Sequence, residues 1–188
     1  MMLKKLFVAA TLALCASGLP YFSFSSPAQA AEAPATAPVQ SIMDVATQKW
    51  ADTGPDTPDY FDPAYIGNFS ARLRKLYAQA SKHPAFDTDE ETGNPFDYDP
   101  ILSRQDGCPL KDVTLTEAGK TGAATDIVAR FKGGTCFEGV SPEERDAISQ
   151  IQFRVITEDG KPVIDEAITG EGDEKYALSD ELKAIISQ

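Results

Sequence analysis

The stretch QIQFRVITEDGKPVIDEAI, residues 150–168, carries the pattern from which the fold class follows. Apolar side chains at every second position from 151 to 155 alternate with polar neighbours, as is typical of a strand with one buried face. Asp159 and Gly160 then predict a tight hairpin turn, because the centre of such a turn favours this pair. Residues 163–168 return as the antiparallel partner. The stretch therefore predicts a β-hairpin.

Two segments upstream show the same alternation. Val113 and Leu115 alternate with polar residues, and the apolar side chains between 127 and 131 share one face. Residues 119–122, Gly-Lys-Thr-Gly, lie between these segments and predict a turn, since the earlier glycine of a phosphate-binding loop is missing. Residues 141–144, Ser-Pro-Glu-Glu, predict a short capped helix before the hairpin.

Helical periodicity flanks the strands on both sides. A first helix is expected to begin at Ser41, and a last helix to begin with Ser179 as its N-cap. Between them, Asp62 as N-cap and Pro63 in the first turn predict one continuous helix that ends at His83. Its apolar stripe consists of Ile66, Phe69, Leu73, Leu76, Tyr77 and Ala80.

This order predicts an α+β fold, in which N-terminal helices pack on a curved antiparallel sheet and a short C-terminal helix follows. Helices precede the strands instead of alternating with them, which disfavours a doubly wound parallel sheet. The length suits one domain, which we expect over residues 41–188. Residues 31–40 contain almost no large apolar side chain, so we expect a flexible lead-in there.

The first thirty residues have the composition of a secretory signal peptide. Lys4 and Lys5 precede an apolar run that is shorter than a membrane-spanning helix, and Ala28-Gln29-Ala30 supplies small residues for cleavage. We expect cleavage after Ala30, export to a bacterial periplasm and no stable membrane insertion of the mature chain. The alternative is a lipid anchor on Cys15, which the bulky Leu14 before it disfavours.

The chain is strongly acidic. Its 188 residues carry a formal net charge of −12, from 17 basic and 29 acidic side chains. Removal of Lys4 and Lys5 with the signal leaves 15 basic against 29 acidic side chains, or −14. Phosphate groups repel such a surface, so we expect no nucleic acid as partner.

Export also determines the expected redox state of the cysteines. The mature chain keeps only Cys108 and Cys136, and two cysteines in an oxidising compartment predict one disulfide. No C-x-x-C spacing and no neighbouring histidine supports a metal or redox pair.

The motif FDYDPILSRQD, residues 96–106, resembles the DUF3828 family of small exported bacterial proteins. The similarity extends over about residues 60–188 through the order of elements. Ile164-Asp165 also matches that family, whereas Pro162 and Val163 stand where its members usually carry a tryptophan. The resemblance implies an NTF2-like or cystatin-like cone, and it implies no established activity.

Four polar residues of this motif are the candidate site: Asp97, Asp99, Gln105 and Asp106. One interpretation is that they cap and turn the chain around a short helix at 101–104. The other interpretations are contact with a ligand or partner, a hard cation, or acid–base catalysis. Capping is the leading interpretation, and we expect no metal there.

Other polar features predict no chemistry. Residues 87–91 are acidic but lack the glycine and glutamate that a calcium loop requires at fixed positions. His83 is the only histidine, and no serine or cysteine has the surroundings of an activated nucleophile.

We therefore expect a binding domain without cofactor or catalytic residues, whose partner is an unidentified protein or small molecule. The alternatives are an immunity-type inhibitor of a secreted toxin, and an NTF2-like enzyme with an aspartate as acid or base.

Overall fold

The computed structural model describes residues 33–51, 57–86, 93–170, 172 and 175–188. The predicted signal peptide with its cleavage site, Cys15 and the acidic stretch 87–91 lie outside the described residues.

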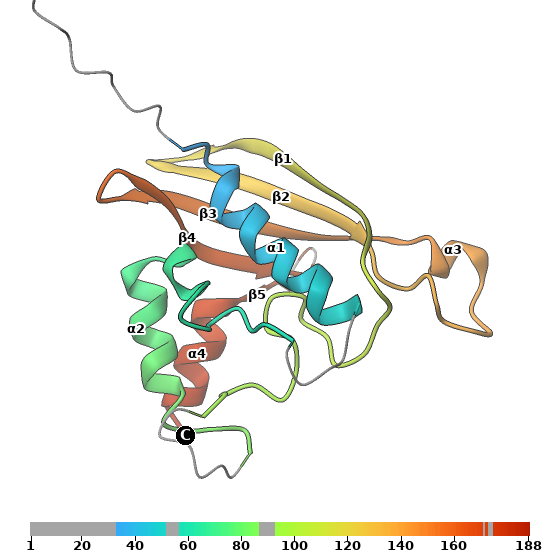
Figure 1. The fold of residues 1–188 in the computed structure, drawn as a ribbon, viewed down its shortest axis with the longest axis horizontal. Helices are drawn as coiled ribbons and strands as arrows, with labels where there is room; N and C mark the ends of the chain where they lie inside the picture. The colour runs from blue at the N-terminus through green and yellow to red at the C-terminus, as the bar shows by residue number, and fades with distance from the viewer. Residues whose placement is uncertain (1–32, 52–56, 87–92, 171, 173–174) are drawn as a thin grey trace, which may run out of the picture. The chain divides into compact units, whose positions relative to one another are not determined.

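A five-stranded antiparallel sheet forms the centre of the fold, with its strands side by side in chain order (Figure 1). The strands are β1 (Lys111–Thr121), β2 (Ala124–Lys132), β3 (Ile148–Glu158), β4 (Lys161–Thr169) and β5 (Tyr176–Ala177). Helices pack against this curved sheet and a short helix ends the chain, so the predicted α+β class is confirmed. The narrower assignment to an NTF2-like or cystatin-like cone stays a prediction.

The alternating pattern places the expected side chains in the core. Ile127, Ala129 and Phe131 of β2 are buried, as are the apolar residues of β3. The register sets Ile127 opposite Phe153 and Ala129 opposite Ile151, so the two strands bury the same face. The alternation predicted from the sequence is confirmed here.

The predicted hairpin between β3 and β4 is also confirmed. Asp159 and Gly160 have φ of 51° and 74°, the left-handed values that a two-residue turn of this kind requires. Beyond the turn, Val155 pairs with Ile164 and Arg154 with Glu166, so Asp165 is the extra residue of a β-bulge.

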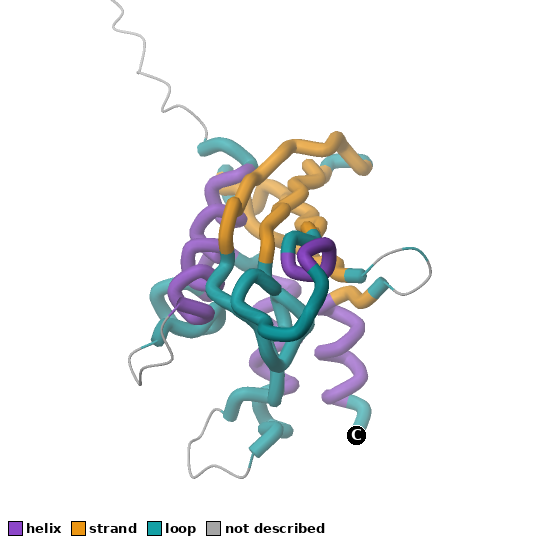
Figure 2. The backbone as a smooth tube through the Cα atoms, turned by 90° about the vertical axis from the view of Figure 1, so that its right-hand side faces the viewer, coloured by secondary structure: helices purple, strands orange, loops and turns teal. Residues whose placement is uncertain are grey.

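Helix α1 (Thr36–Ala51) lies across the sheet and contacts β1, β2 and β4 (Figures 1 and 2). The predicted start at Ser41 is wrong, and residues 36–40 of the expected flexible lead-in are helical. Pro38 is tolerated because the first N–H groups of a helix have no intrahelical partner. Val39 is fully buried, and its burial favours the earlier start.

The predicted long helix from Asp62 is interrupted. A short 3₁₀ turn, η1 (Ile66–Asn68), precedes an extended Phe69, and α2 covers only Ala71–Ala80. The interruption arises because the backbone N–H of Ser70 donates to the carbonyl of Ile164 in β4, at 2.8 Å. Ser70 then caps α2, with its Oγ accepting from the backbone N–H of Leu73 at 3.2 Å.

The remaining helices differ in how they are capped. Helix α3 (Pro142–Arg145) has the predicted cap, with Ser141 and Glu144 bonding reciprocally. Helix α4 (Leu178–Ile186) begins one residue before Ser179, and the predicted Ser179 cap is wrong. Instead, Oε1 of Glu166 in β4 accepts from the backbone N–H of Ser179 at 2.9 Å, and a carboxylate is favourable at a helix N-terminus.

Helices α2 and α4 pack against each other beside β4 (Figure 1). Among the helices of the described ranges, none combines the length and the apolar character needed to cross a bilayer.

Candidate functional site

A pocket of about 490 Å³ lies between the end of α1 and the segment 96–107. All four predicted residues, Asp97, Asp99, Gln105 and Asp106, line it. Its other lining residues are Lys49, Trp50, Phe86, Phe96, Tyr98, Arg104 and Gly107. The structure thus brings the candidate residues together, and their contact with a ligand stays a prediction.

The polar motif is a tight turn and not the expected short helix at 101–104. The backbone N–H of Asp99 donates to the carbonyl of Arg104 at 2.9 Å, and the two residues form an isolated antiparallel bridge. Within the turn, Oδ1 of Asp99 accepts from the N–H groups of Ile101 and Leu102, at 3.0 and 2.8 Å. The predicted helix is therefore wrong and Asp99 has no helix to cap there, but it does turn the chain as predicted.

The second oxygen of Asp99 is equally occupied. Oδ2 accepts from the indole Nε1–H of Trp50 at 2.8 Å and from the hydroxyl of Tyr60 at 2.6 Å. A carboxylate offers about four acceptor sites, and all of them are filled. Asp99 is only 6% exposed and joins α1, the segment after it and the turn. It positions the wall of the pocket.

This arrangement changes the pKa of the Tyr60 side chain. Its burial, and then the neighbouring charge of Asp99, raise the pKa of the Tyr60 phenol well above its ordinary value. The phenol therefore stays a hydrogen-bond donor over the physiological pH range.

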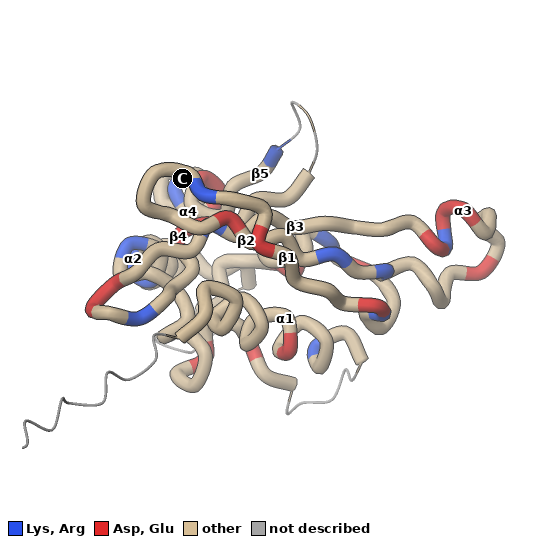
Figure 3. The backbone as a smooth tube through the Cα atoms, turned by 90° about the horizontal axis from the view of Figure 1, so that it is seen from above, with Lys and Arg blue, Asp and Glu red and all other residues tan. Residues whose placement is uncertain are grey.

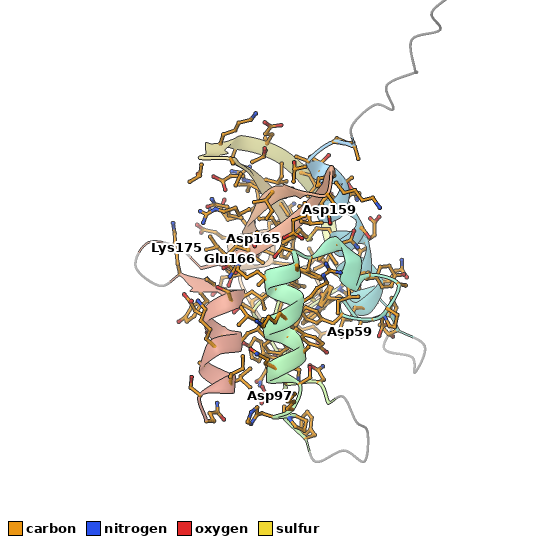
Figure 4. The ribbon with its side chains drawn as sticks, turned by 90° about the vertical axis from the view of Figure 1, so that its left-hand side faces the viewer. Asp59, Asp97, Asp159, Asp165, Glu166 and Lys175 are labelled. Atoms are coloured by element: carbon orange, nitrogen blue, oxygen red, sulfur yellow. A yellow bond between two sulfur atoms is a disulfide. The ribbon has the colours of Figure 1, made fainter. Side chains whose placement is uncertain are left out.

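Asp97, Gln105 and Asp106 have a different environment. All three are exposed at the rim of the pocket, and none forms a hydrogen bond or ion pair with another residue of the described ranges. Figure 4 shows Asp97 near one end of α2, with Asp165 and Glu166 near the other. Unlike Asp97, these two carboxylates are paired, because both bind Arg72. The rim thus has polar groups whose hydrogen-bonding capacity is open to a ligand.

Arg104, which lies between Asp99 and Gln105 in the sequence, is half-buried in the wall of the pocket. Its Nη2 donates to Oγ of Ser149 at 3.0 Å, and its Nη1 donates to the carbonyl of Gly133 at 3.4 Å. The guanidinium carbon lies 5.5 Å from the ring centroid of Phe131. Burial lowers the pKa of Arg104, against the opposing charges of Asp99 and Asp106, and the side chain remains a cation.

Lys49 is the other cation of the pocket. Its Nζ lies 2.7 Å from Oδ2 of Asp59 and 4.7 Å from the ring centroid of Tyr60. An ion pair and a cation–π contact therefore fix its ammonium group at the partly exposed wall.

Aromatic side chains form the apolar part of the wall. Trp50 packs on Gly107, where an added Cβ would lie 2.5 Å from the indole ring. Phe96 is buried and meets Tyr98 edge-on, with ring centroids 5.6 Å apart. Burial and Glu181 raise the pKa of Tyr98 to about 12.

The predicted disulfide between Cys108 and Cys136 is confirmed, with a Cα–Cα distance of 5.4 Å. Cys108 follows Gly107 directly, and its backbone N–H donates to the carbonyl of Gly133 at 3.0 Å. The bond ties the pocket segment to the chain that leaves β2.

Sequence reasoning missed Trp50 and Arg104 as site residues. Trp50 is the only tryptophan of the chain, and Arg104 stands inside the polar motif, so both signals were available. What could not be seen is that α1 and the motif meet. Within the described ranges, no three potential metal ligands converge.

Comparison with known proteins adds no assignment: no family model matches the chain, and no curated protein or solved structure does so either.

Proposed function

We propose that this protein is an exported binding domain, related to the DUF3828 family, which holds a small molecule in the pocket without transforming it. The observation that carries the proposal is the pocket itself, because about 490 Å³ falls inside the range of about 300–1,000 Å³ that is usual for ligand sites. Aromatic walls and a few polar groups at the rim are the composition that such sites share.

Binding is favoured over catalysis by the state of the carboxylates. Asp99 is the buried one, and its acceptor sites are already filled by Trp50, Tyr60 and two backbone N–H groups. It therefore has no free lone pair with which to take a proton from a substrate. Asp97 and Asp106 are exposed at the rim, where water competes with a substrate for their oxygens.

Export is supported by the covalent framework. Disulfides form and persist in oxidising compartments, and the bond between Cys108 and Cys136 joins the two cysteines of the expected mature chain. Together with the leader-like composition of residues 1–30, this supports export to a periplasm with cleavage after Ala30.

The single tryptophan offers a direct test, because it lines the pocket. A library of small molecules is titrated into the purified protein while the indole N–H resonance and the fluorescence of Trp50 are recorded. We expect a subset of compounds to shift both signals. Asp106→Lys should change which compounds bind, whereas Asp112→Lys, outside the pocket, should not. A library that leaves the Trp50 signals of the folded protein unchanged would contradict the proposal.

A protein partner is the second candidate, and one observation favours it. The segment that carries α3 extends beyond the sheet, and residues 141–148 are all exposed (Figures 1 and 3). Phe137 is 39% exposed, and residues 138–146 hold four acidic side chains against Arg145 as the one basic side chain. An apolar group among acidic ones suits a basic protein target, as an immunity-type inhibitor would need.

Affinity capture from periplasmic extract at low salt, followed by mass spectrometry, tests this candidate. A genuine partner should be lost with the double substitution Phe137→Ala and Glu138→Lys. It should be retained with Tyr176→Ala, which changes an exposed aromatic residue elsewhere. Equal capture by both variants would argue against recognition through the α3 segment.

A further inference from the structure

We propose that the pocket binds a zwitterion, a free amino acid or short peptide with an apolar side chain, whose carboxylate pairs with Arg104 and whose ammonium pairs with Asp97 and Asp106. This inference rests on the proposed function, since it assigns a ligand class to the same pocket.

The environment of Arg104 is the first reason. Its half-buried guanidinium has five N–H donors, and in the described structure the side chain donates only to two neutral oxygens, those of Gly133 and Ser149. No carboxylate of the described ranges forms an ion pair with it. Asp99 and Asp106 act on this half-buried cation only through their charge, without a direct ion pair, and a ligand carboxylate would supply a bidentate partner.

The placement of this cation depends on a missing side chain. An added Cβ at Gly133 would lie 2.3 Å from Nη1 of Arg104. Glycine therefore leaves the space that the guanidinium occupies between the end of β2 and the pocket.

The rim carboxylates are the second reason. Asp97 and Asp106 line the same pocket, are exposed, and have no ion-pair partner among the described residues. Two negative charges beside one available positive charge disfavour a simple anion in the pocket. They favour a ligand with both charges, because its ammonium then lies near the aspartates while its carboxylate reaches Arg104.

The aromatic walls define the rest of the ligand. Trp50, Phe96 and Phe86 present apolar surface to the pocket. An apolar or aromatic side chain would bury its own surface against them, and a cation near these rings is also favoured.

Calorimetric titration of the purified protein tests the inference with three zwitterions: L-phenylalanine, L-leucine and the dipeptide leucyl-phenylalanine. Two analogues of phenylalanine remove one charge each, 2-phenylethylamine lacking the carboxylate and 3-phenylpropanoate lacking the ammonium. We expect at least one zwitterion to bind and to shift the Trp50 signals. If this is phenylalanine or the dipeptide, each one-charge analogue should bind about tenfold more weakly or worse.

Variants separate the two charges of the site. Arg104→Gln should weaken binding of the zwitterion about tenfold and leave binding of 2-phenylethylamine unchanged. The double substitution Asp97→Asn and Asp106→Asn should weaken the zwitterion and the amine. Gly133→Ala retains the charge but displaces the flexible end of Arg104, so it should reproduce the Arg104→Gln effect. Arg130→Gln, an exposed cation of β2 outside the pocket, is the matched control.

The outcomes distinguish this inference from the proposed function. If no zwitterion binds but other library compounds shift the Trp50 signals, the ligand class is wrong and the pocket is still a binding site. If Arg104→Gln and Gly133→Ala leave zwitterion affinity unchanged, Arg104 is not the carboxylate site. If no compound of any kind shifts Trp50, both proposals fail.

Discussion

Asp99 connects parts of the chain that are far apart in sequence. Its four hydrogen bonds reach Trp50 in α1, Tyr60 in the following segment, and the backbone of Ile101 and Leu102. In all four bonds the partner donates and a carboxylate oxygen of Asp99 accepts. A single buried side chain therefore sets the position of the pocket wall.

We expect Asp99→Asn to lower the free energy of unfolding by about 2–4 kcal/mol, because the new amide NH₂ would face donors and leave hydrogen bonds unmade. Urea unfolding followed by Trp50 fluorescence measures the change. Asp97→Asn, two residues earlier and exposed, should stay within about 0.5 kcal/mol of the native protein. Equal effects of the two substitutions would show that Asp99 does not organise the turn.

Alkaline pH should destabilise the protein through the partly buried Tyr98. Burial and Glu181 raise the pKa of Tyr98 from the ordinary 10.0 to about 12. The unfolded chain loses this phenolic proton near pH 10 while the folded chain retains it. The contribution to stability is therefore complete below pH 10 and is lost as the pH rises to about 12.

Urea unfolding at a series of pH values on either side of pH 10 measures this loss. Tyr98→Phe should make the fall in unfolding free energy shallower. Tyr176→Phe, which alters an exposed ring, should leave the slope as it is in the native protein. An identical slope in all three proteins would contradict the role given to Tyr98.

At the level of elements, two helix starts depend on β4. Ser70 begins α2 next to Ile164, and its hydroxyl donates to Oδ1 of Asp165 at 2.8 Å. Helix α4 begins where Glu166 accepts from the backbone N–H of Ser179. The bulge at Asp165 lets two consecutive carboxylates reach these helices.

Ser70→Ala should cost about 2 kcal/mol of unfolding free energy, because the N-cap of α2 and a hydrogen bond to a carboxylate are both lost. Ser179→Ala is the matched comparison, since Ser179 stands at a helix start but its hydroxyl caps nothing. We expect that substitution to change stability by less than about 0.5 kcal/mol. Chemical denaturation of both variants decides the matter, and a costlier Ser179→Ala would refute the assignment of the caps.

At the scale of the whole molecule, one covalent bond joins the pocket segment to the chain that leaves β2. The disulfide spans a sequence separation of 28 residues. The double substitution Cys108→Ala and Cys136→Ala should lower the unfolding free energy by about 3–4 kcal/mol, because the unfolded chain regains the entropy of that loop. Denaturation of native protein with and without reductant should give the same difference, and the variant should not respond to reductant.

Local patterns were sufficient for β1 to β4, whereas the short β5 was not predicted. The alternation around Ile127 and Phe153 and the Asp159-Gly160 turn depend on neighbours in sequence, and each was predicted correctly. The disulfide followed from the two cysteines that remain once Cys15 is assigned to the predicted signal peptide, together with the expected oxidising compartment. The helix boundaries failed where a distant backbone or side-chain group intervened, as Ile164 does before Ser70 and Glu166 does at Ser179.

The residues of the candidate site could likewise be predicted only in part. The motif at 96–106 marked the polar residues, because its aspartates and glutamine are visible in sequence. Its partners in the pocket wall could not be predicted, because Trp50 lies 49 positions from Asp99 and contacts it only through the tertiary packing of α1.

By itself, then, the sequence determined the α+β class, the hairpin and the pairing of Cys108 with Cys136. Periodicity, turn chemistry and the two cysteines of the expected mature chain leave few alternatives. Only the tertiary structure decided that Asp99 is a support and that Arg104 faces a ligand-sized pocket. The physical reason is that burial and hydrogen-bond partners are properties of residues brought together by packing, and the chain order does not contain them.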